Sequence, residues 1–304
     1  MRFFKPKERI VATIGYPGHG KSVFLASLFW DSFFFLSRAF QDDRLPFSVR
    51  AATEEASKVF YGNARLLHDL VLPPANPRTR PEPAALEFKG IPSCLNSQRR
   101  NLKLTFYDIA GEVFMDDART REYAPFVSEA TDFIFLFDPT HAEFNALSAA
   151  QLVDLVHRLA QKKKNLVVAL TKMDELCARD EWWASAVGER WMDSILTLSD
   201  LDNYFDQMKW ISETMRNWWI DEERTGYNLL GSLPANTHFC MLSSLGHQPV
   251  WPCPSCEATN AATLDSCSEC DAGRANARIR LARKPEPFRV RDPLFWIFRE
   301  AGVM

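Results

Sequence analysis

The sequence has no excess of charge of either sign. Its 36 Lys and Arg residues nearly balance 39 Asp and Glu residues, so the net charge is −3. A protein without a broad positive field does not bind nucleic acids unspecifically through its whole surface. The composition therefore excludes a general nucleic-acid-coating protein and leaves only local contacts for such a ligand.

The sequence also lacks an uninterrupted hydrophobic run of membrane length. The most apolar stretch, from Phe24 to Phe40, is interrupted by Asp31 and Arg38. It is also shorter than the roughly 20 apolar residues that span a bilayer. We therefore expect this stretch to form a buried helix.

Features of secreted proteins are scarce as well. The apolar segment near the N-terminus is interrupted by Gly18, His19 and Lys21, which is unlike a signal peptide. Only seven cysteines occur, and four of them form two Cys-x-x-Cys pairs, which is a metal-binding pattern and not a disulfide framework. The other three cysteines, Cys94, Cys177 and Cys240, are not paired in the sequence, and we expect them to be reduced thiols. We expect a cytoplasmic protein.

What the chain does contain is enough apolar sequence for a large core, with 46% hydrophobic residues among 304. Residues 132–139 and 165–175 contain continuous apolar runs, typical of parallel strands buried on both faces. Helical patterns alternate with such runs, which predicts an α/β fold with a doubly wound, mainly parallel sheet. The strands are predicted within residues 9–14, 84–91, 102–112, 132–139, 165–175 and 236–246.

A phosphate-binding loop follows the first predicted strand. Gly15 to Ser22, GYPGHGKS, fit the pattern G-x-x-x-x-G-K-[ST] between a strand and a helix. Backbone N–H groups of such a loop converge on a phosphate, Lys21 bridges the β- and γ-phosphates, and the Ser22 hydroxyl is a ligand for Mg²⁺. The predicted nucleotide-binding residues are Gly15, Gly18, His19, Gly20, Lys21 and Ser22. The loop alone does not choose between ATP and GTP.

Three later motifs also follow predicted strands, where open α/β sheets bind ligands. They are DIAG at Asp108–Gly111, TKMD at Thr171–Asp174 and SSLG at Ser243–Gly246. With the loop, they resemble the Ras-like, translation-factor-related (TRAFAC) class of P-loop GTPases. With RDPLFWIF near the end, the arrangement is similar to bacterial double-GTPase proteins. The resemblance implies that Asp108 reaches Mg²⁺ and that the Gly111 N–H senses the γ-phosphate.

The TKMD motif favours GTP over ATP. The Asp174 carboxylate can accept hydrogen bonds from N1–H and the exocyclic NH₂ of guanine, whereas adenine lacks this pair of donors and would leave the acceptors unpaired. The resemblance implies that Thr171 belongs to the same motif and that Lys172 lies along the base. It also implies that backbone N–H groups of the SSLG motif recognise guanine O6. The residues expected there are Ser243, Ser244 and Leu245, and the expected ligands are GTP or GDP with Mg²⁺.

At the position expected to direct hydrolysis, this chain differs from Ras-like GTPases. Ras-like members carry a water-orienting Gln where this chain has Glu112. A carboxylate accepts a hydrogen bond from the attacking water but is repelled by the γ-phosphate, so we expect slow hydrolysis unless a partner assists. Thr79 is assigned as the switch Thr that covers Mg²⁺, with Thr53 as the alternative. Arg119 and Arg121 follow the DIAG motif and are expected to be solvated surface charges, with contact to the phosphates in a closed state as the alternative.

The four paired cysteines predict a separate module. Four thiolates form a closed tetrahedral site for structural zinc, with no open position for catalysis. With Trp251 and Asn260, their spacing resembles a RanBP2-type zinc finger, whose members bind single-stranded RNA, ubiquitin or other proteins. The residues that ubiquitin-binding and RNA-binding members use are replaced at 257–258 and 261–262, so a protein ligand is expected, with a nucleic acid as the less favoured alternative. The predicted zinc ligands are Cys253, Cys256, Cys267 and Cys270.

We expect a GTPase domain at residues 1–246 with a Trp-rich helical insertion at about 176–232, a zinc finger at 247–276, and a helix at 277–304 that completes the GTPase domain. The insertion should pack on the sheet through one helix with apolar residues at helical spacing. The function expected is a GTP-binding switch with slow or partner-stimulated hydrolysis and an effector or activating protein as partner. The alternatives are an ATP-using P-loop enzyme and an interaction protein whose nucleotide site is structural.

Overall fold

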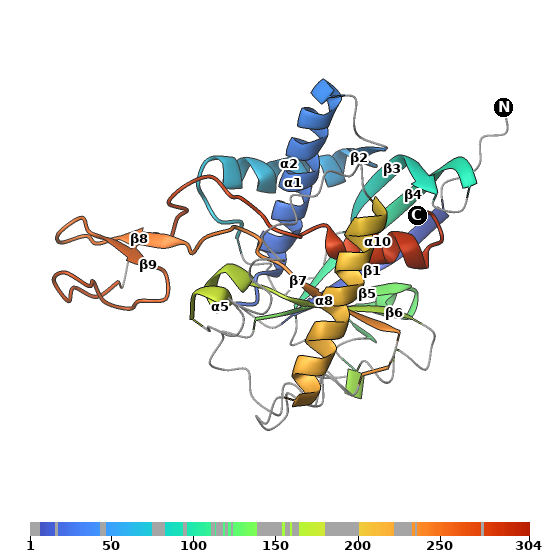
Figure 1. The fold of residues 1–304 in the computed structure, drawn as a ribbon. Coiled ribbons are helices and arrows are strands. Elements are labelled where there is room, and N and C mark those ends of the chain that lie inside the picture. Colours follow the sequence, from blue (N-terminus) through green and yellow to red (C-terminus); the bar gives the residue numbers. More distant parts are fainter. Residues whose placement is uncertain are drawn as a thin grey trace.

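The computed structural model describes residues 7–15, 18–42, 47–74, 83–93, 96–110, 113, 118, 121–122, 124–138, 154–155, 159, 164–179, 201–221, 233–234, 236–274 and 277–304. Its centre is a seven-stranded sheet in the order β2-β3-β4-β1-β5-β6-β7 (Figure 1). The strands are β1 (Lys7–Gly15), β2 (Ser48–Ala51), β3 (Ala84–Ser93), β4 (Asn96–Ala110), β5 (Asp132–Phe137), β6 (Asn165–Leu170) and β7 (Thr237–Met241).

The strands β4, β1, β5, β6 and β7 run parallel, and at one edge β3 pairs antiparallel with β4 and β2 pairs antiparallel with β3. The prediction of a mainly parallel sheet is therefore confirmed. Each strand expected from the sequence is present, whereas β2 was not predicted. It has only four residues and none of them is fully buried, so it gives no hydrophobic pattern to recognise.

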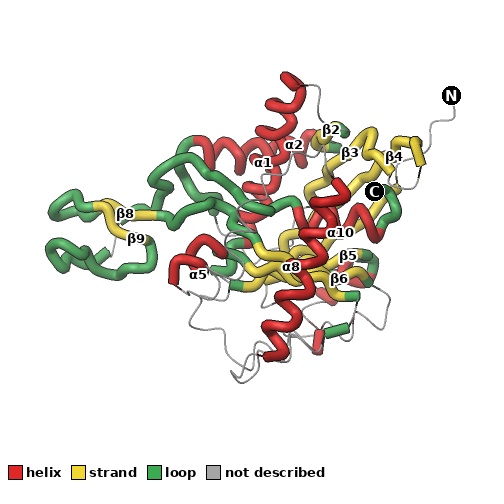
Figure 2. Tube along the Cα trace, viewed as in Figure 1, coloured by secondary structure: helices red, strands yellow, loops and turns green. Residues whose placement is uncertain are grey.

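The helices pack around this sheet (Figure 2). They are α1 (Lys21–Asp42), α2 (Glu54–His68), the 3₁₀ helix η2 (Pro125–Ser128), α5 (Met173–Arg179), α8 (Leu201–Asp221) and α10 (Asp292–Glu300). A separate two-stranded sheet of β8 (Val250–Pro252) and β9 (Thr259–Ala261) stands out from the body in Figure 1. None of the described helices is long and apolar enough to cross a membrane.

Alternate residues of the central strands face two hydrophobic clusters. Val11 and Ile134 lie in one cluster, with α1, α2 and α10, while Ala12 and Phe133 lie in the other. Both faces of these strands are therefore buried, which is why their sequences are continuously apolar. The helix α8 contributes to both clusters through Tyr204, Phe205, Met208, Ile211 and Met215. This confirms that its apolar stripe packs on the core.

The helix α8 also covers the open edge of β7. The backbone N–H of Phe239 donates to the Ser212 hydroxyl at 2.9 Å, and the Arg216 guanidinium donates to the Thr237 carbonyl at 2.8 Å. Side chains of α8 thus replace the next strand as hydrogen-bonding partners. A sheet edge with its groups satisfied in this way is protected from pairing with another chain.

The C-terminal helix α10 is fixed by a buried polar network. The Asp292 carboxylate accepts hydrogen bonds from the Tyr204 hydroxyl and from Nε of Arg289, the latter at 2.7 Å. Arg291 pairs with Asp31 of α1 at 2.8 Å. Burial raises the pKa of Tyr204 well above its usual range, so this side chain remains a neutral donor. The network joins α10 to both α1 and α8.

Candidate functional site

The predicted nucleotide-binding motifs meet at one edge of the sheet. The phosphate-binding loop follows β1, Asp108 lies near the end of β4, and the TKMD and SSLG motifs follow β6 and β7. These four strands are parallel, so their carboxyl ends lie on the same side. This is where open α/β sheets bind ligands.

The loop after β1 has the backbone shape that its glycines permit. Gly18 and Gly20 have φ of 83° and 79°, values that other residues rarely adopt. A Cβ on Gly15 would lie 2.8 Å from the Leu136 carbonyl oxygen, whereas no described atom would lie within 4 Å of one on Gly20. The Lys21 ammonium donates to the Gly15 carbonyl at 2.5 Å. The Lys21 ammonium thus lies against the first residue of the loop.

The two predicted magnesium ligands from α1 and β4 are adjacent. The Ser22 hydroxyl donates to the Asp108 carboxylate at 3.0 Å. An alcohol and a carboxylate are oxygen donors of the kind that Mg²⁺ prefers. The pair therefore fits a Mg²⁺ site at the start of α1.

His19 is turned away from the interior of the loop. Its side chain is buried and Nδ1 lies 3.3 Å from the backbone N of Asp138 and 3.3 Å from the Leu136 carbonyl oxygen. Its ring also lies edge-on to Phe137. The imidazole therefore anchors the loop to β5, and only the His19 backbone is suited to a phosphate.

A buried carboxylate that the sequence analysis missed supports the TKMD motif. The Asp138 side chain is fully buried directly after β5 and pairs with Nζ of Lys172 at 2.5 Å. Thr171 is buried too, and its hydroxyl lies within hydrogen-bonding distance of the carbonyl oxygens of Phe137 and His19, at 3.3 and 3.4 Å. These contacts tie the motif to the phosphate-binding loop. The available signal was a carboxylate ending an apolar strand at the ligand-binding edge.

The TKMD and SSLG motifs contact each other directly. The Ser243 hydroxyl donates to the Asp174 carboxylate and accepts from the Gly246 N–H at 2.9 Å. The Ser243 N–H donates to the Phe288 carbonyl at 3.1 Å. Ser243 therefore orients Asp174 with its side chain, and its own backbone donor is already engaged.

The predicted hydrolytic residues lie outside the described part of the chain. Glu112, Gly111, Thr79 and Arg119 are among them, so these assignments stay predictions. The alternative switch residue, Thr53, is the N-cap of α2, and its hydroxyl accepts from the Ala56 N–H at 3.1 Å. This contact gives Thr53 a structural role at the start of a helix. Arg121 is exposed, as expected.

The four paired cysteines come together. Their Sγ atoms all lie within 4.8 Å of one another, with Cys253 and Cys270 at 3.6 Å and Cys256 and Cys267 at 3.5 Å. Sulfurs about 2.3 Å from a tetrahedral zinc lie about 3.8 Å apart, so the cluster fits this ion. The Glu269 N–H donates to the Cys267 sulfur at 3.4 Å. With further hydrogen bonds from the Cys270 backbone and from the Cys256 and Asn260 side chains, it lowers the pKa of the Cys267 thiol to about 6.

The residues that accompany the cysteines stabilise the small module. Trp251 is fully buried, and its Nε1–H lies 3.1 and 3.0 Å from the carbonyl oxygens of Ala261 and Leu264. Asn260 accepts from the Ser268 N–H at 2.9 Å and donates to the Ala258 carbonyl at 3.0 Å. The Asn260 side chain therefore connects the two Cys-x-x-Cys segments to each other.

The sequence model of the family described as Double-GTPase 2 matches residues 9–216, more than half of the chain. This chain belongs to the Double-GTPase 2 family. The family match covers the phosphate-binding loop and the DIAG and TKMD motifs, and ends before the SSLG motif and the cysteines. Membership supports GTP binding and GTPase activity. A comparison with curated protein sequences finds no match.

Among solved structures, Sup35 complexed with GDP is 14% identical and matches over 80% of this chain and 38% of that one, with a TM-score of 0.29. The S. cerevisiae Ski7 GTPase-like domain bound to GTP is 13% identical and matches over 79% of this chain and 43% of that one, with a TM-score of 0.36. The signal recognition particle receptor SRb-GTP/SRX complex from Chaetomium thermophilum is 13% identical and matches over 81% of this chain and 94% of that one, with a TM-score of 0.33. The Double-GTPase 2 chain thus spans less than half the length of the first two.

Proposed function

We propose that this chain is a GTP-binding switch with slow or partner-stimulated hydrolysis. The observation that supports this most strongly is the convergence of the phosphate-binding loop, Asp108, the TKMD motif and the SSLG motif at one sheet edge. The contact of Thr171 with the His19 carbonyl joins the phosphate-binding loop to the TKMD motif, and the contact of Ser243 with Asp174 joins that motif to the SSLG motif. Family membership agrees with the proposal.

At the phosphate end, the backbone of Gly15, Gly18, His19 and Gly20 would bind the phosphates together with the Lys21 ammonium. Ser22, Asp108 and Thr79 would hold Mg²⁺, which neutralises phosphate charge when bound. The hydrogen bond between Ser22 and Asp108 supports the first two of these assignments.

At the base end, Asp174 would accept both guanine donors while Lys172 lies along the base. The Ser243 hydroxyl keeps one Asp174 oxygen oriented. Because the Ser243 N–H is engaged by Phe288, we assign the contacts with guanine O6 to the N–H groups of Ser244 and Leu245. An adenine ring would leave the Asp174 acceptors unpaired.

Hydrolysis would depend on residues of the second switch. Glu112 would orient the attacking water, and the Gly111 N–H would contact the γ-phosphate. The negative charge of Glu112 opposes the approach of water to the γ-phosphate, so intrinsic turnover would be slow and an activating protein would raise it. We place this switch in the cytoplasm, where its thiols stay reduced.

The cysteine module would bind one structural Zn²⁺ and dock a partner protein. All four protein ligands of a tetrahedral ion are present, so the metal has no open position for substrate. The side chains with which RanBP2-type zinc fingers bind RNA or ubiquitin are replaced in this chain at residues 257–258 and 261–262. A protein-docking role is therefore the one we assign to residues 247–276.

The test is a comparison of fluorescent GTP and ATP binding with Mg²⁺, followed by single-turnover hydrolysis. We expect strong preference for GTP and slow cleavage. Preference for ATP would establish the alternative of an ATP-using enzyme. Tight GTP binding without any turnover, with or without captured partners, would favour an interaction protein whose nucleotide site is structural.

A further inference from the structure

The cysteine module is joined to the body by paired backbone, although its sequence predicts a semi-independent unit. Val250 and Arg280 exchange two backbone hydrogen bonds, each of 2.8 Å, where the chain enters and leaves the module. The Leu281 N–H then donates to the carbonyl of Leu70, just after α2, at 2.9 Å. A movement of the module would therefore move the segment that follows it.

That segment, residues 280–288, runs beside the SSLG motif, and we call it the stem. The Glu286 N–H donates to the Leu245 carbonyl at 2.9 Å. Ser243 and Phe288 exchange two further hydrogen bonds, of 3.1 and 2.8 Å. Three backbone hydrogen bonds thus fix the SSLG motif to the stem.

Side-chain packing makes this contact tight. Gly246 has φ of 74°, and a Cβ on it would lie 2.3 Å from the Glu286 carbonyl oxygen. Leu281 is almost fully buried in a cluster with Ala26 of α1 and Leu67 of α2, against which Leu245 packs. The SSLG motif and the stem therefore form one packed unit that touches both helices.

We propose that the stem is a positioning element for the guanine-binding loop, so that the state of the cysteine module sets how tightly the base is held. This inference rests on the proposed function, in which the SSLG motif contacts guanine. A partner that displaces the module, or loss of the metal that holds it together, would shift the stem and weaken the base contacts. Because such coupling is reciprocal, guanine nucleotide would in turn stabilise the module.

Leu281→Ala tests the stem without changing any proposed nucleotide contact. We expect GTP and GDP to bind roughly five- to tenfold more weakly, mainly through faster dissociation. The loss should be equal for the two nucleotides, because they share the base and differ only at the γ-phosphate. Leu281→Met, which keeps the side-chain volume, should restore dissociation close to that of the parent. Leu264→Ala, at an exposed leucine of the module, is the matched control.

Dissociation is measured with fluorescent GTP and GDP at a temperature where circular dichroism shows the variant fully folded. An unchanged rate in the folded variant would overturn the inference, and so would a loss confined to GTP. If the parent protein does not prefer GTP over ATP, the proposed function fails instead. If the parent prefers GTP and Leu281→Ala behaves like it, only the positioning role of the stem fails.

Discussion

At the scale of residues, two carboxylates of the nucleotide site have different tasks. Asp174 is half-buried and oriented by Ser243 toward the proposed base site, whereas Asp138 is fully buried against Lys172. The first task follows from a recognisable motif. The second depends on a pairing between β5 and the loop after β6, which no local pattern reveals.

Asp138→Asn should weaken GTP binding by about 1–2 kcal/mol, because Lys172 loses the charged partner that places it along the base. Titration with fluorescent GTP measures the change. Asp265→Asn is the matched control, since this exposed carboxylate pairs with Arg274 in the cysteine module. Equal affinities of Asp138→Asn and the parent would show that Lys172 is positioned by its backbone alone.

Lys21→Ala should abolish nucleotide binding while the fold persists, because Lys21 contributes charge to the loop and little to the core. The readout is nucleotide binding together with thermal unfolding. Lys209→Ala, which removes an exposed lysine from α8, should bind as the parent does. Retained GTP binding by Lys21→Ala would refute the phosphate-loop assignment.

Asp174→Ala should reduce GTP affinity by about 2–4 kcal/mol, since guanine donors would be left unpaired in a partly desolvated pocket. Affinity for ATP should change far less. Competition between the two nucleotides measures both values at once. Equal losses for both would show that Asp174 only supports the Ser243 loop.

At the scale of elements, the sequence predicted the strands of the parallel sheet and the amphipathic character of α8. Buried parallel strands have continuous apolar sequences, and α8 has a clear helical period. The helix α2 was missed, although it has a Thr53 cap and two acidic residues in its first turn. Two of the four residues in its buried stripe are alanines, Ala56 and Ala64, which give only a weak hydrophobic signal. The stem was missed because its contacts are made by backbone atoms, which side-chain patterns do not report.

The cysteine module yields a prediction at this scale. The double variant Cys253→Ser and Cys256→Ser should lose one bound zinc per chain and unfold the module, because Zn–S bonds replace a large core there. GTP binding should survive with faster dissociation, since no phosphate ligand lies in the module but its stem contacts the SSLG motif. Partner capture should fail.

Metal analysis, nucleotide dissociation and partner capture on this double variant measure the three effects. Absence of zinc from the parent would refute the metal assignment. Complete loss of GTP binding would show that the module and the phosphate site form a single folding unit.

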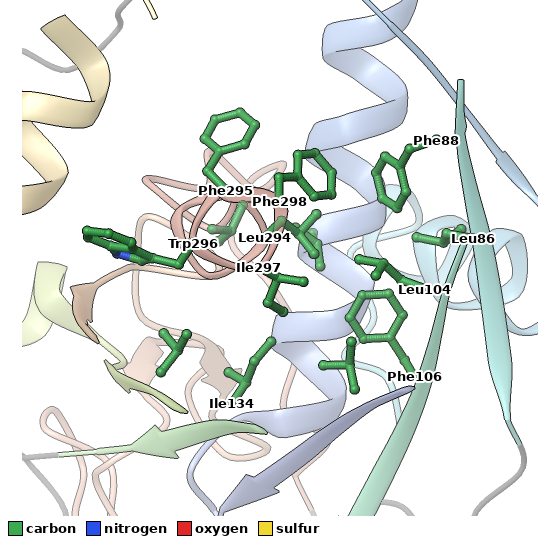
Figure 3. Packing of buried hydrophobic residues seen from close by; sticks show 14 of the residues in the cluster. Leu86, Phe88, Leu104, Phe106, Ile134, Leu294, Phe295, Trp296, Ile297 and Phe298 are labelled. Carbon is green, nitrogen blue, oxygen red and sulfur yellow. The ribbon is translucent and has the colours of Figure 1, made fainter. Parts of the chain in front are cut away.

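At the scale of the whole molecule, α10 covers part of the hydrophobic core by packing against residues that are distant from it in the sequence. Phe298 is fully buried and its ring lies edge-on to Phe88 of β3, with centroids 4.9 Å apart (Figure 3). Phe298→Ala should lower the free energy of unfolding by about 3–5 kcal/mol. Urea unfolding measures the loss. Leu264→Ala, at an exposed position, should change stability by less than about 0.5 kcal/mol, and similar losses for both would contradict the packing seen here.

From the position of α10 we expect the core to close late in folding. The Lys7 ammonium donates to the Ala301 carbonyl at 2.7 Å, so the first strand and the last turn of the chain meet. The sheet surface that α10 covers, over β6 and β7 and at Phe88 of β3, is complete only when residues 242–291 have closed as a loop. Loop-closure entropy rises with flexible length. A metal cross-link that takes residues 253–270 out of that length would hasten the last step of folding, when the protein is most exposed to aggregation.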